Sequence, residues 1–100
     1  MTLVVTGVFR VPPENLQALH PHMAAVVMTS RAERGCLDYA YAEDLLDPGL
    51  IRVVERWTDQ AALDAHAIAP HMDAWKTARE ALGFHGRDLT IFEVTAERAL

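Results

Sequence analysis

Several residue types are scarce in this chain of 100 residues, and each scarcity argues against a class of protein. The one cysteine, Cys36, excludes an internal disulfide framework and a Cys-x-x-Cys metal site. The one serine, Ser30, lies near a predicted helix end and not in a nucleophile elbow, which argues against serine catalysis. The one lysine, Lys76, and a formal net charge of -5 argue against a nucleic acid or an anionic membrane as partner, because both attract basic patches.

Long apolar runs are also missing. No stretch approaches the roughly 20 apolar residues that a membrane-spanning helix requires. The apolar residues at the start, Met1 to Val5, lack the basic leader of a secretory signal peptide, so we expect a cytoplasmic protein. What is present is typical of a globular chain, since 51% of the residues are hydrophobic and 23% are charged. The length fits a single domain over residues 1–100.

Six segments have the patterning of regular secondary structure. Four are rich in β-branched and aromatic residues or alternate in polarity, which predicts strands, and two repeat apolar residues every three or four positions, which predicts amphipathic helices. In chain order they are strand 3–11, helix 13–34, strand 36–43, strand 50–57, helix 60–82 and strand 87–95. The order β-α-β-β-α-β predicts an α+β, ferredoxin-like fold, a four-stranded antiparallel sheet with both helices on one face.

Proline, glycine and aspartate residues mark the expected ends and breaks of the helices. Pro21 lies inside the first helix and should kink it or mark a restart near His20. Gly35 is placed to end that helix, and Asp59 to cap the second one. Pro70 then predicts a break within the second helix.

Both faces of the sheet are expected to be at least partly buried. Val4 and Val8 lie on one face of the first strand while Leu3 and Val5 lie on the other, and Val54 repeats this pattern in the third strand. Helices cover only one face. A second copy of the sheet is the simplest cover for the other face, so we predict a homodimer.

Aromatic side chains and two ionisable groups are expected to meet between the sheet and the second helix. Alternation places Leu37, Tyr39 and Tyr41 on one face of the second strand. The candidates for this cluster are Tyr39, Tyr41, Glu55, Trp57, His66, Met72 and Trp75. A mostly apolar cavity with one carboxylate and one imidazole suits a flat organic ligand. The same residues are compatible with an ordinary core in which Glu55 pairs with an arginine, and periodicity does not decide between the two.

The five histidines do not have the spacing of a helical metal site. His20 and His22 are two residues apart and lie on different helix faces. His66 and His71 are five apart, which a continuous helix would separate, although a break at Pro70 could bring them closer. Neither pair has i, i+4 spacing and no cysteine completes a set, so we predict no metal site.

Five short motifs, in this order and spacing, resemble the antibiotic biosynthesis monooxygenase (ABM) domain of the dimeric α/β barrel superfamily. They are Gly35-Cys36-Leu37-Asp38-Tyr39, Asp47-Pro48, Val53-Val54-Glu55-Arg56-Trp57-Thr58-Asp59, Ala62-Leu63-Asp64-Ala65-His66 and Pro70-His71-Met72. The similarity spans nearly the whole chain and is strongest to quinol monooxygenase-like members. The fold of this family agrees with the predicted element order and with the second buried face.

The resemblance implies a monooxygenase that uses dioxygen, without metal or flavin, on a small aromatic quinol, anthrone or polyketide-type phenol. A phenolate can donate an electron to dioxygen directly, so the protein need only bind the substrate, remove a proton and stabilise charge. His66 is the first candidate for the base and His71 the second, while Glu55 could orient the histidine or a substrate hydroxyl. The residues expected to bind the substrate are Tyr39, Tyr41, Val53, Trp57, Met72 and Trp75.

The sequence also departs from parts of this family. Some antibiotic-tailoring members carry an asparagine where Val53 stands. The haem-degrading branch has a tryptophan where His66 stands, so haem degradation is not expected. Two alternatives stay open: an isomerase that moves protons with the same histidine and carboxylate, and a non-catalytic dimeric ligand-binding domain.

Overall fold

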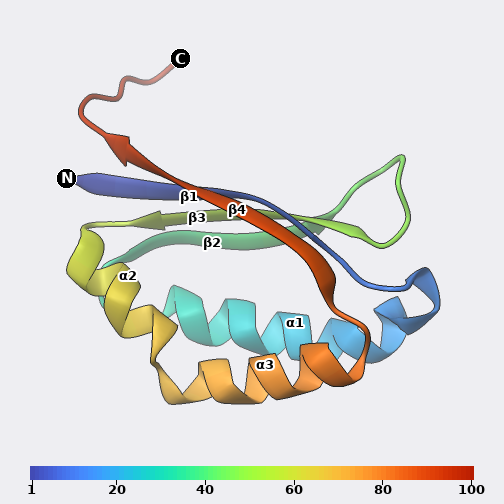
Figure 1. Ribbon diagram of the computed structural model, residues 1–100. Helices are drawn as coiled ribbons and strands as arrows, with labels where there is room; N and C mark the ends of the chain where they lie inside the picture. The colour runs from blue at the N-terminus through green and yellow to red at the C-terminus, as the bar shows by residue number, and fades with distance from the viewer.

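The computed structural model describes residues 1–100 and contains one four-stranded antiparallel sheet with all helices on one face (Figure 1). In chain order the elements are β1 (Thr2–Arg10), the short 3-10 helix η1 (Pro13–Asn15), α1 (Leu16–Arg31), β2 (Cys36–Glu43), β3 (Leu50–Trp57), α2 (Gln60–Ala67), α3 (Pro70–Ala81) and β4 (His85–Val94). The strands lie in the order β2-β3-β1-β4. The predicted ferredoxin-like α+β fold is confirmed. None of the helices combines the length and the apolar character that a membrane crossing requires.

The hairpin of β2 and β3 begins and ends where the sequence predicts. The connecting turn contains Asp47 and Gly49, and the Leu50 N–H donates to the Asp47 carbonyl at 3.1 Å. The Asp47 carboxylate also pairs with the Arg10 guanidinium at 2.7 Å, which ties the turn to the end of β1. This turn therefore fixes the register of β3 between its two neighbours.

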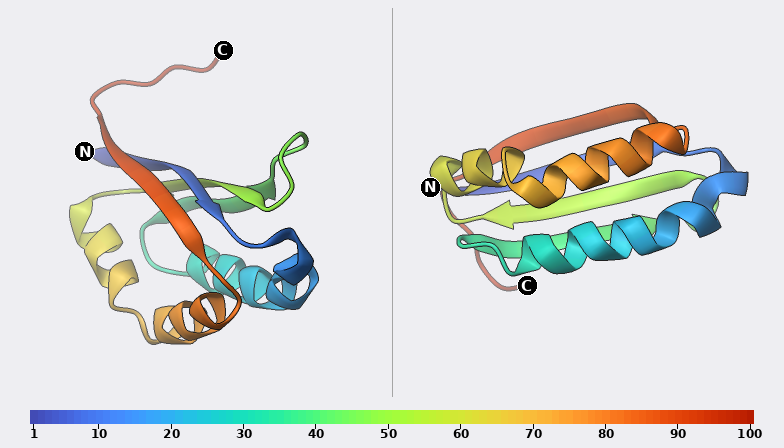
Figure 2. Two further views of the ribbon diagram at one scale, coloured as in Figure 1. Left: turned by 45° about the vertical axis from the view of Figure 1, so that its right-hand side comes forward. Right: turned by 90° about the horizontal axis from the view of Figure 1, so that it is seen from below.

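The first helix rules out one of the two effects predicted for Pro21. Helix α1 continues through Pro21 without a restart and lies beside α3 beneath the sheet (Figure 2). Proline removes only one backbone donor, and it does so in the second turn of the helix, near the end where donors are already free. Leu19, Met23 and Val26 are buried on both sides of Pro21, and this packing against the sheet holds the helix together.

The second helix is interrupted as predicted. Helix α2 begins after Asp59, whose carboxylate accepts the Ala62 N–H at 2.9 Å, and it ends at Ala67. Pro70 is the first residue of α3, a position where its missing N–H costs nothing. The chain changes direction between the two helices (Figure 1), so residues at the end of α2 and the start of α3 face one another.

Strand β2 corrects a second prediction. Leu37 does not share the face of Tyr39 and Tyr41, because the pairing of β2 with β3 shifts register between Cys36 and Asp38. Leu37 is consequently 49% exposed, while Tyr39 is buried. An irregularity of one residue reverses the alternation on one side of it, and the sequence pattern carries no mark of it.

The face of the sheet without helices is open and partly apolar. Val54 is 39% exposed at the centre of β3, and Phe92 is 52% exposed on β4. Val54 lies opposite Thr6 in the sheet, and Phe92 lies opposite Val4. The homodimer stays a prediction, and this face is where the second copy would pack.

Val54→Asp is expected to convert the dimer to a monomer, because a charge at the centre of this face would lose its hydration on pairing. The measurement is the molar mass by light scattering across a concentration series. Ile68→Asp makes the same change at an exposed residue between α2 and α3, and it should leave the mass unchanged. A wild-type protein with the mass of one chain would contradict the prediction.

Candidate active site

A cavity of about 420 Å³ lies between the helix layer and the sheet. Eleven of its 18 lining residues are hydrophobic, and they come from all four strands and from α2 and α3. Six of the predicted site residues line it: Tyr39, Tyr41, Val53, Glu55, His66 and Met72. The sheet and the second helical segment thus enclose a space of the size and character of a small-molecule site.

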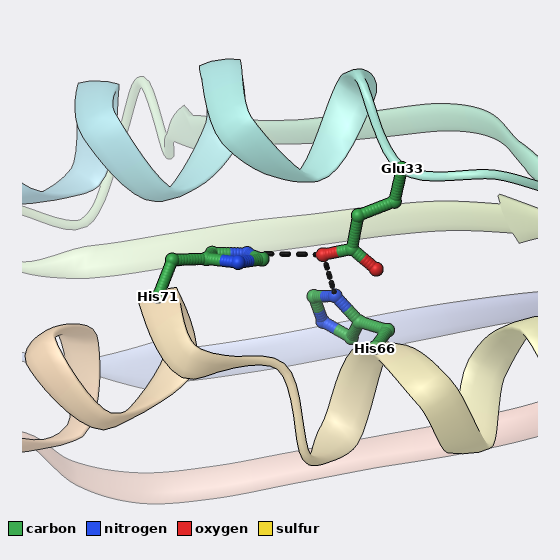
Figure 3. A group of neighbouring side chains, drawn as sticks. All are labelled: Glu33, His66 and His71. Atoms are coloured by element: carbon green, nitrogen blue, oxygen red, sulfur yellow. Dashed lines mark hydrogen bonds and ion pairs between the residues drawn. The ribbon is translucent and has the colours of Figure 1, made fainter.

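His66 is positioned in the last turn of α2 and is only 4% exposed. Its ring packs against the Trp57 ring, with centroids 4.7 Å apart, and against the Tyr39 ring at 5.2 Å. Nδ1 of His66 lies 2.9 Å from Oε1 of Glu33 (Figure 3). Aromatic packing and this hydrogen bond fix the ring at the cavity wall.

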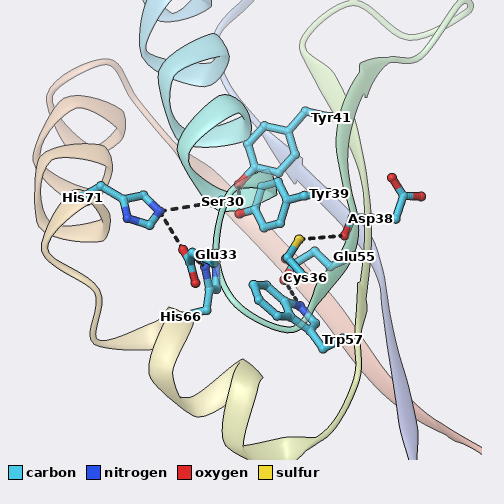
Figure 4. Close-up of polar contacts among 10 residues, drawn as sticks. All are labelled: Ser30, Glu33, Cys36, Asp38, Tyr39, Tyr41, Glu55, Trp57, His66 and His71. Atoms are coloured by element: carbon cyan, nitrogen blue, oxygen red, sulfur yellow. Dashed lines mark hydrogen bonds and ion pairs between the residues drawn. The ribbon is translucent and has the colours of Figure 1, made fainter.

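Glu33 connects His66 to His71. The same Oε1 atom of Glu33 lies 3.0 Å from Nε2 of His71, and Oγ of Ser30 lies 3.1 Å from that nitrogen (Figure 4). A carboxylate only accepts, so each histidine donates a ring N–H to it. In neutral His66 the proton is then held on Nδ1, which leaves Nε2 as the basic nitrogen.

The turn that carries Glu33 packs closely against helix α2. Glu33 lies between α1 and β2, where its N–H donates to the Ser30 carbonyl at 3.0 Å and its carbonyl accepts the Cys36 N–H at 3.1 Å. Gly35 has a φ of +82°, and a β-carbon there would lie 2.6 Å from the Ala62 side chain. A glycine at this position thus lets the turn sit against α2, which brings Glu33 to His66.

Sequence reasoning missed Glu33 and Ser30. Glu33 and His66 are 33 residues apart in the chain, and a carboxylate in a turn is most often solvated. The one usable signal in the sequence is Pro70, because a break there could bring His66 and His71 closer. Their ring centroids are in fact 5.9 Å apart.

Three predicted site residues lie outside the cavity wall. Trp57 is fully buried behind the wall, and its indole N–H donates to Glu55 at 3.0 Å. Trp75 packs into the main core with Phe9. His71 faces Glu33 and Ser30, so it reaches the cavity only through Glu33 and His66. Strand alternation and side-chain size predict that these residues lie between the sheet and the helices. Which of them line the cavity depends on side-chain packing, which the sequence pattern does not give.

Glu55 is the buried carboxyl of the cavity, at 6% exposed. Burial raises the pKa of Glu55 above its ordinary value of 4.5, and this outweighs the hydrogen bond from Trp57 and the electrostatic effects of His66 and Arg87, which act in the opposite direction. The protonated form is therefore favoured more than in water. A protonated Glu55 can donate a hydrogen bond to a ligand oxygen.

Glu55→Gln is expected to gain thermal stability relative to wild type as pH rises. A carboxyl with a raised pKa binds its proton more tightly in the folded chain, so wild type loses stability from the unfolded pKa through the native one. Glutamine keeps an oxygen for the Trp57 N–H but does not ionise. The difference in Tm between the two proteins, measured from pH 4 to pH 8, should move in favour of the variant. A difference that is constant or moves the other way would contradict this.

Tyr39 and Tyr41 form a pair at the cavity wall. Their hydroxyl oxygens are 3.0 Å apart, and the rings are 5.4 Å apart. Burial raises the pKa of both phenols, that of Tyr41 to about 12. Both hydroxyls are therefore neutral near pH 7, where they can orient a ligand but not act as bases.

One group of side chains could hold a metal ion. The donor atoms of Glu33, His66 and His71 all lie within 4.8 Å of one another. Two imidazoles and one carboxylate are ligands that transition-metal ions accept. The spacing in the sequence did not reveal this group, because it is completed by Glu33. In the structure the same atoms are joined by hydrogen bonds from the two histidines to Glu33.

Comparisons with known proteins agree with this architecture. Residues 2–78 match the family described as Antibiotic biosynthesis monooxygenase. The probable quinol monooxygenase YgiN of Escherichia coli is 34% identical over 70 residues, which is 62% of this chain and 67% of that protein. The structure of Rv0793 from Mycobacterium tuberculosis superposes with a TM-score of 0.85 at 26% identity, covering 99% of this chain and 100% of that one.

A further solved structure extends the likeness. PA3566 from Pseudomonas aeruginosa superposes with a TM-score of 0.78 at 30% identity, covering 97% of this chain and 95% of that one. The family match covers most of the chain, including Glu33, the cavity strands β1 to β3 and both histidines. Together with the quinol monooxygenase relative, it supports a monooxygenase-type function. The chain belongs to the antibiotic biosynthesis monooxygenase family.

Proposed function

We propose that this protein is a cofactor-independent monooxygenase that oxidises a small aromatic quinol, anthrone or polyketide-type phenol, with His66 as the base. The observation that carries the proposal is the position of His66, which lines a largely apolar cavity while Glu33 holds its Nδ1–H. The proposal includes the homodimer and the cytoplasmic location expected from the sequence. It also gives substrate-binding roles to Tyr39, Tyr41 and Met72, which line the same cavity.

Binding comes first. Phe9, Tyr39, Tyr41 and Phe84 contribute aromatic surface to the cavity, and a flat ligand can stack against such surface. A ligand that fills the space also displaces water. The charges that develop during the reaction are then less screened, so the polar groups of the wall act on them more strongly.

Proton removal comes second. Nε2 of His66 takes the acidic proton of the bound phenol or anthrone, and the ring becomes a cation that donates to Glu33 through Nδ1. The Glu33 carboxylate stabilises this cation. His71 donates to the same oxygen and holds the carboxylate in place, so it has a positioning role. Glu55 and the tyrosine pair are available to orient the substrate oxygen.

Oxygen transfer comes third, and with an anthrone it balances as follows. The substrate anion gives one electron to dioxygen, and the two radicals combine to form a carbon-bound peroxide. The O–O bond then breaks as the carbon loses its second hydrogen. A methylene group and dioxygen thereby become a carbonyl group and water, with one oxygen atom retained in the product.

The test is oxygen uptake by chelator-treated, flavin-free protein with hydroquinones, naphthohydroquinones and anthrones. These compounds autoxidise, so the quantity measured is the excess over the protein-free rate, and one product oxygen should derive from labelled dioxygen. Uptake that appears only when a metal or flavin is restored would overturn cofactor independence. If no oxygen is consumed but a substrate hydrogen exchanges with deuterated water, the isomerase alternative is favoured. A bound substrate that neither exchanges nor reacts would favour the ligand-binding domain.

A further inference from the structure

Three positively charged side chains line one end of the cavity, in a chain whose net charge is -5. Lys76 and Arg79 are on α3, and Arg87 is on β4. No ion pair or side-chain hydrogen bond within the chain engages any of the three. Arg10, Arg52 and Arg56 form ion pairs, whereas Arg34 and Arg98 are unpaired and lie outside the cavity. Lys76 and Arg87 are exposed to solvent, whereas Arg79 is partly buried, so Arg79 is the cation whose missing acceptor calls for an explanation.

Arg79 is the most constrained of the three. Its guanidinium carbon lies 4.2 Å from the centre of the Phe84 ring and 5.7 Å from that of Trp75. Ring stacking of this kind holds the plane of a guanidinium and leaves its N–H groups directed outward from its edge. Burial lowers the pKa of Arg79, and the nearby Arg87 acts in the same direction. A half-buried, oriented guanidinium without an acceptor is a preformed site for a carboxylate.

The carboxylates of the cavity, unlike its cations, have hydrogen-bond partners within the chain. Glu55 accepts the Trp57 N–H, and Asp64 accepts from the Gln60 side chain at 2.8 Å. Each anion at the cavity therefore has a donor, while the three cations have no acceptor. A ligand that completes the hydrogen bonding of this site must supply acceptors at the cationic end.

The spacing along α3 sets the size of that ligand. Met72, Lys76 and Arg79 line the cavity from one stripe of the helix. Seven residues at 1.5 Å each separate Met72 from Arg79 by roughly 10 Å along the axis. His66 lies at the Met72 end, because α3 begins close to the end of α2. The base and the cations are thus separated by about the length of a fused two- or three-ring aromatic acid.

We propose that the cavity selects aromatic substrates that carry a carboxylate, which binds Arg79 in a bidentate manner beside Lys76 and Arg87, with the phenolic ring toward His66. This inference rests on the proposed function for the aromatic body of the ligand. The carboxylate does not react. It fixes which edge of the substrate faces the base.

The test compares 5,8-dihydroxy-2-naphthoate, whose carboxylate is on the ring opposite the hydroquinone, with its methyl ester, which removes the charge and keeps the rings. After subtraction of protein-free rates, we expect kcat/KM for oxygen uptake to be at least tenfold higher with the acid at low salt. Arg79→Met retains packing on Phe84 and should bring the ratio close to one. Arg34→Met, at an exposed arginine outside the cavity, should leave it unchanged. Equal turnover of acid and ester by wild type would overturn the inference.

A binding measurement separates this inference from the proposed function. 6-Hydroxy-2-naphthoate and its methyl ester have the hydroxyl and the carboxyl group at opposite ends and lack a second hydroxyl, so their dissociation constants can be measured by calorimetry without turnover. We expect the acid to bind at least tenfold more tightly, and Arg79→Met to abolish the difference. Selective binding without oxygen uptake by any substrate would reject the proposed function and retain the inference. Tighter binding of 1-naphthyl phosphate than of the carboxylate would overturn the inference in favour of a phosphorylated ligand.

Discussion

Replacing His66 with alanine is expected to lower kcat/KM for oxygen-dependent turnover by about 100- to 10,000-fold, the usual contribution of a general base. His66 is the one histidine that lines the cavity, and Glu33 fixes its tautomer. His71 cannot replace it, because it lies on the other side of Glu33. The measurement is the protein-dependent rate of oxygen uptake, with Tm recorded to verify folding.

Three comparisons make this result specific to base catalysis. Added imidazole should restore part of the rate in His66→Ala, because the substitution leaves space at the wall where the free base can bind. His22→Ala removes an exposed histidine from α1 and should leave the rate unchanged. Glu33→Gln keeps the size of the side chain but removes the charge that stabilises protonated His66, so we expect a smaller loss of about 10- to 100-fold. A His66→Ala protein that is folded and fully active would reject His66 as the base.

Much of the fold could be predicted because local chemistry marks its boundaries. The hairpin of β2 and β3 has its predicted bounds, since Gly35 and the Asp47-Pro48-Gly49 turn delimit it on the sequence. The misplacement of Leu37 has a different origin. Its face depends on how β2 pairs with β3, and pairing is decided by contacts across the sheet. Pro21 does not restart the helix for a related reason, because packing of α1 on the sheet outweighs one missing hydrogen bond.

The candidate site could be predicted only in part. Strand alternation was enough to place Tyr39 and Glu55 at the cavity, and the family resemblance pointed to His66. Glu33 was missed because its role depends on a contact between a turn and a helix 33 residues away. The cationic residues Lys76, Arg79 and Arg87 were missed as well. In the sequence, a charged residue of an amphipathic helix that lines a cavity looks the same as one that faces solvent, and only the placement of β4 beside α3 separates the two.

Gly7→Ala is expected to destabilise the protein by about 3 kcal/mol or more, although it adds a single methyl group. Gly7 lies in the central strand β1, with a φ of +156°. A β-carbon at this position would overlap the backbone carbonyl oxygen of Asp88 in β4. The neighbouring strands would have to separate, and a carbonyl in a hydrogen-bonded ladder has no inexpensive way to move. At about 4–8 °C per kcal/mol, Tm should fall by more than about 12 °C at fixed protein concentration.

Gly86→Ala is the control that separates the steric overlap at Gly7 from the cost of backbone strain alone. Gly86 has a φ of +61°, but a β-carbon there would meet only the Arg10 side chain at ordinary contact distance, 3.7 Å and beyond. Its expected cost is therefore about 1–2 kcal/mol, that of a left-handed conformation. We also expect Gly7→Ala to lower the rate of oxygen uptake, because Gly7 pairs with Val53 and Leu89, which both line the cavity. If the two variants lost equal stability, close approach of β1 and β4 would not be what requires glycine at position 7.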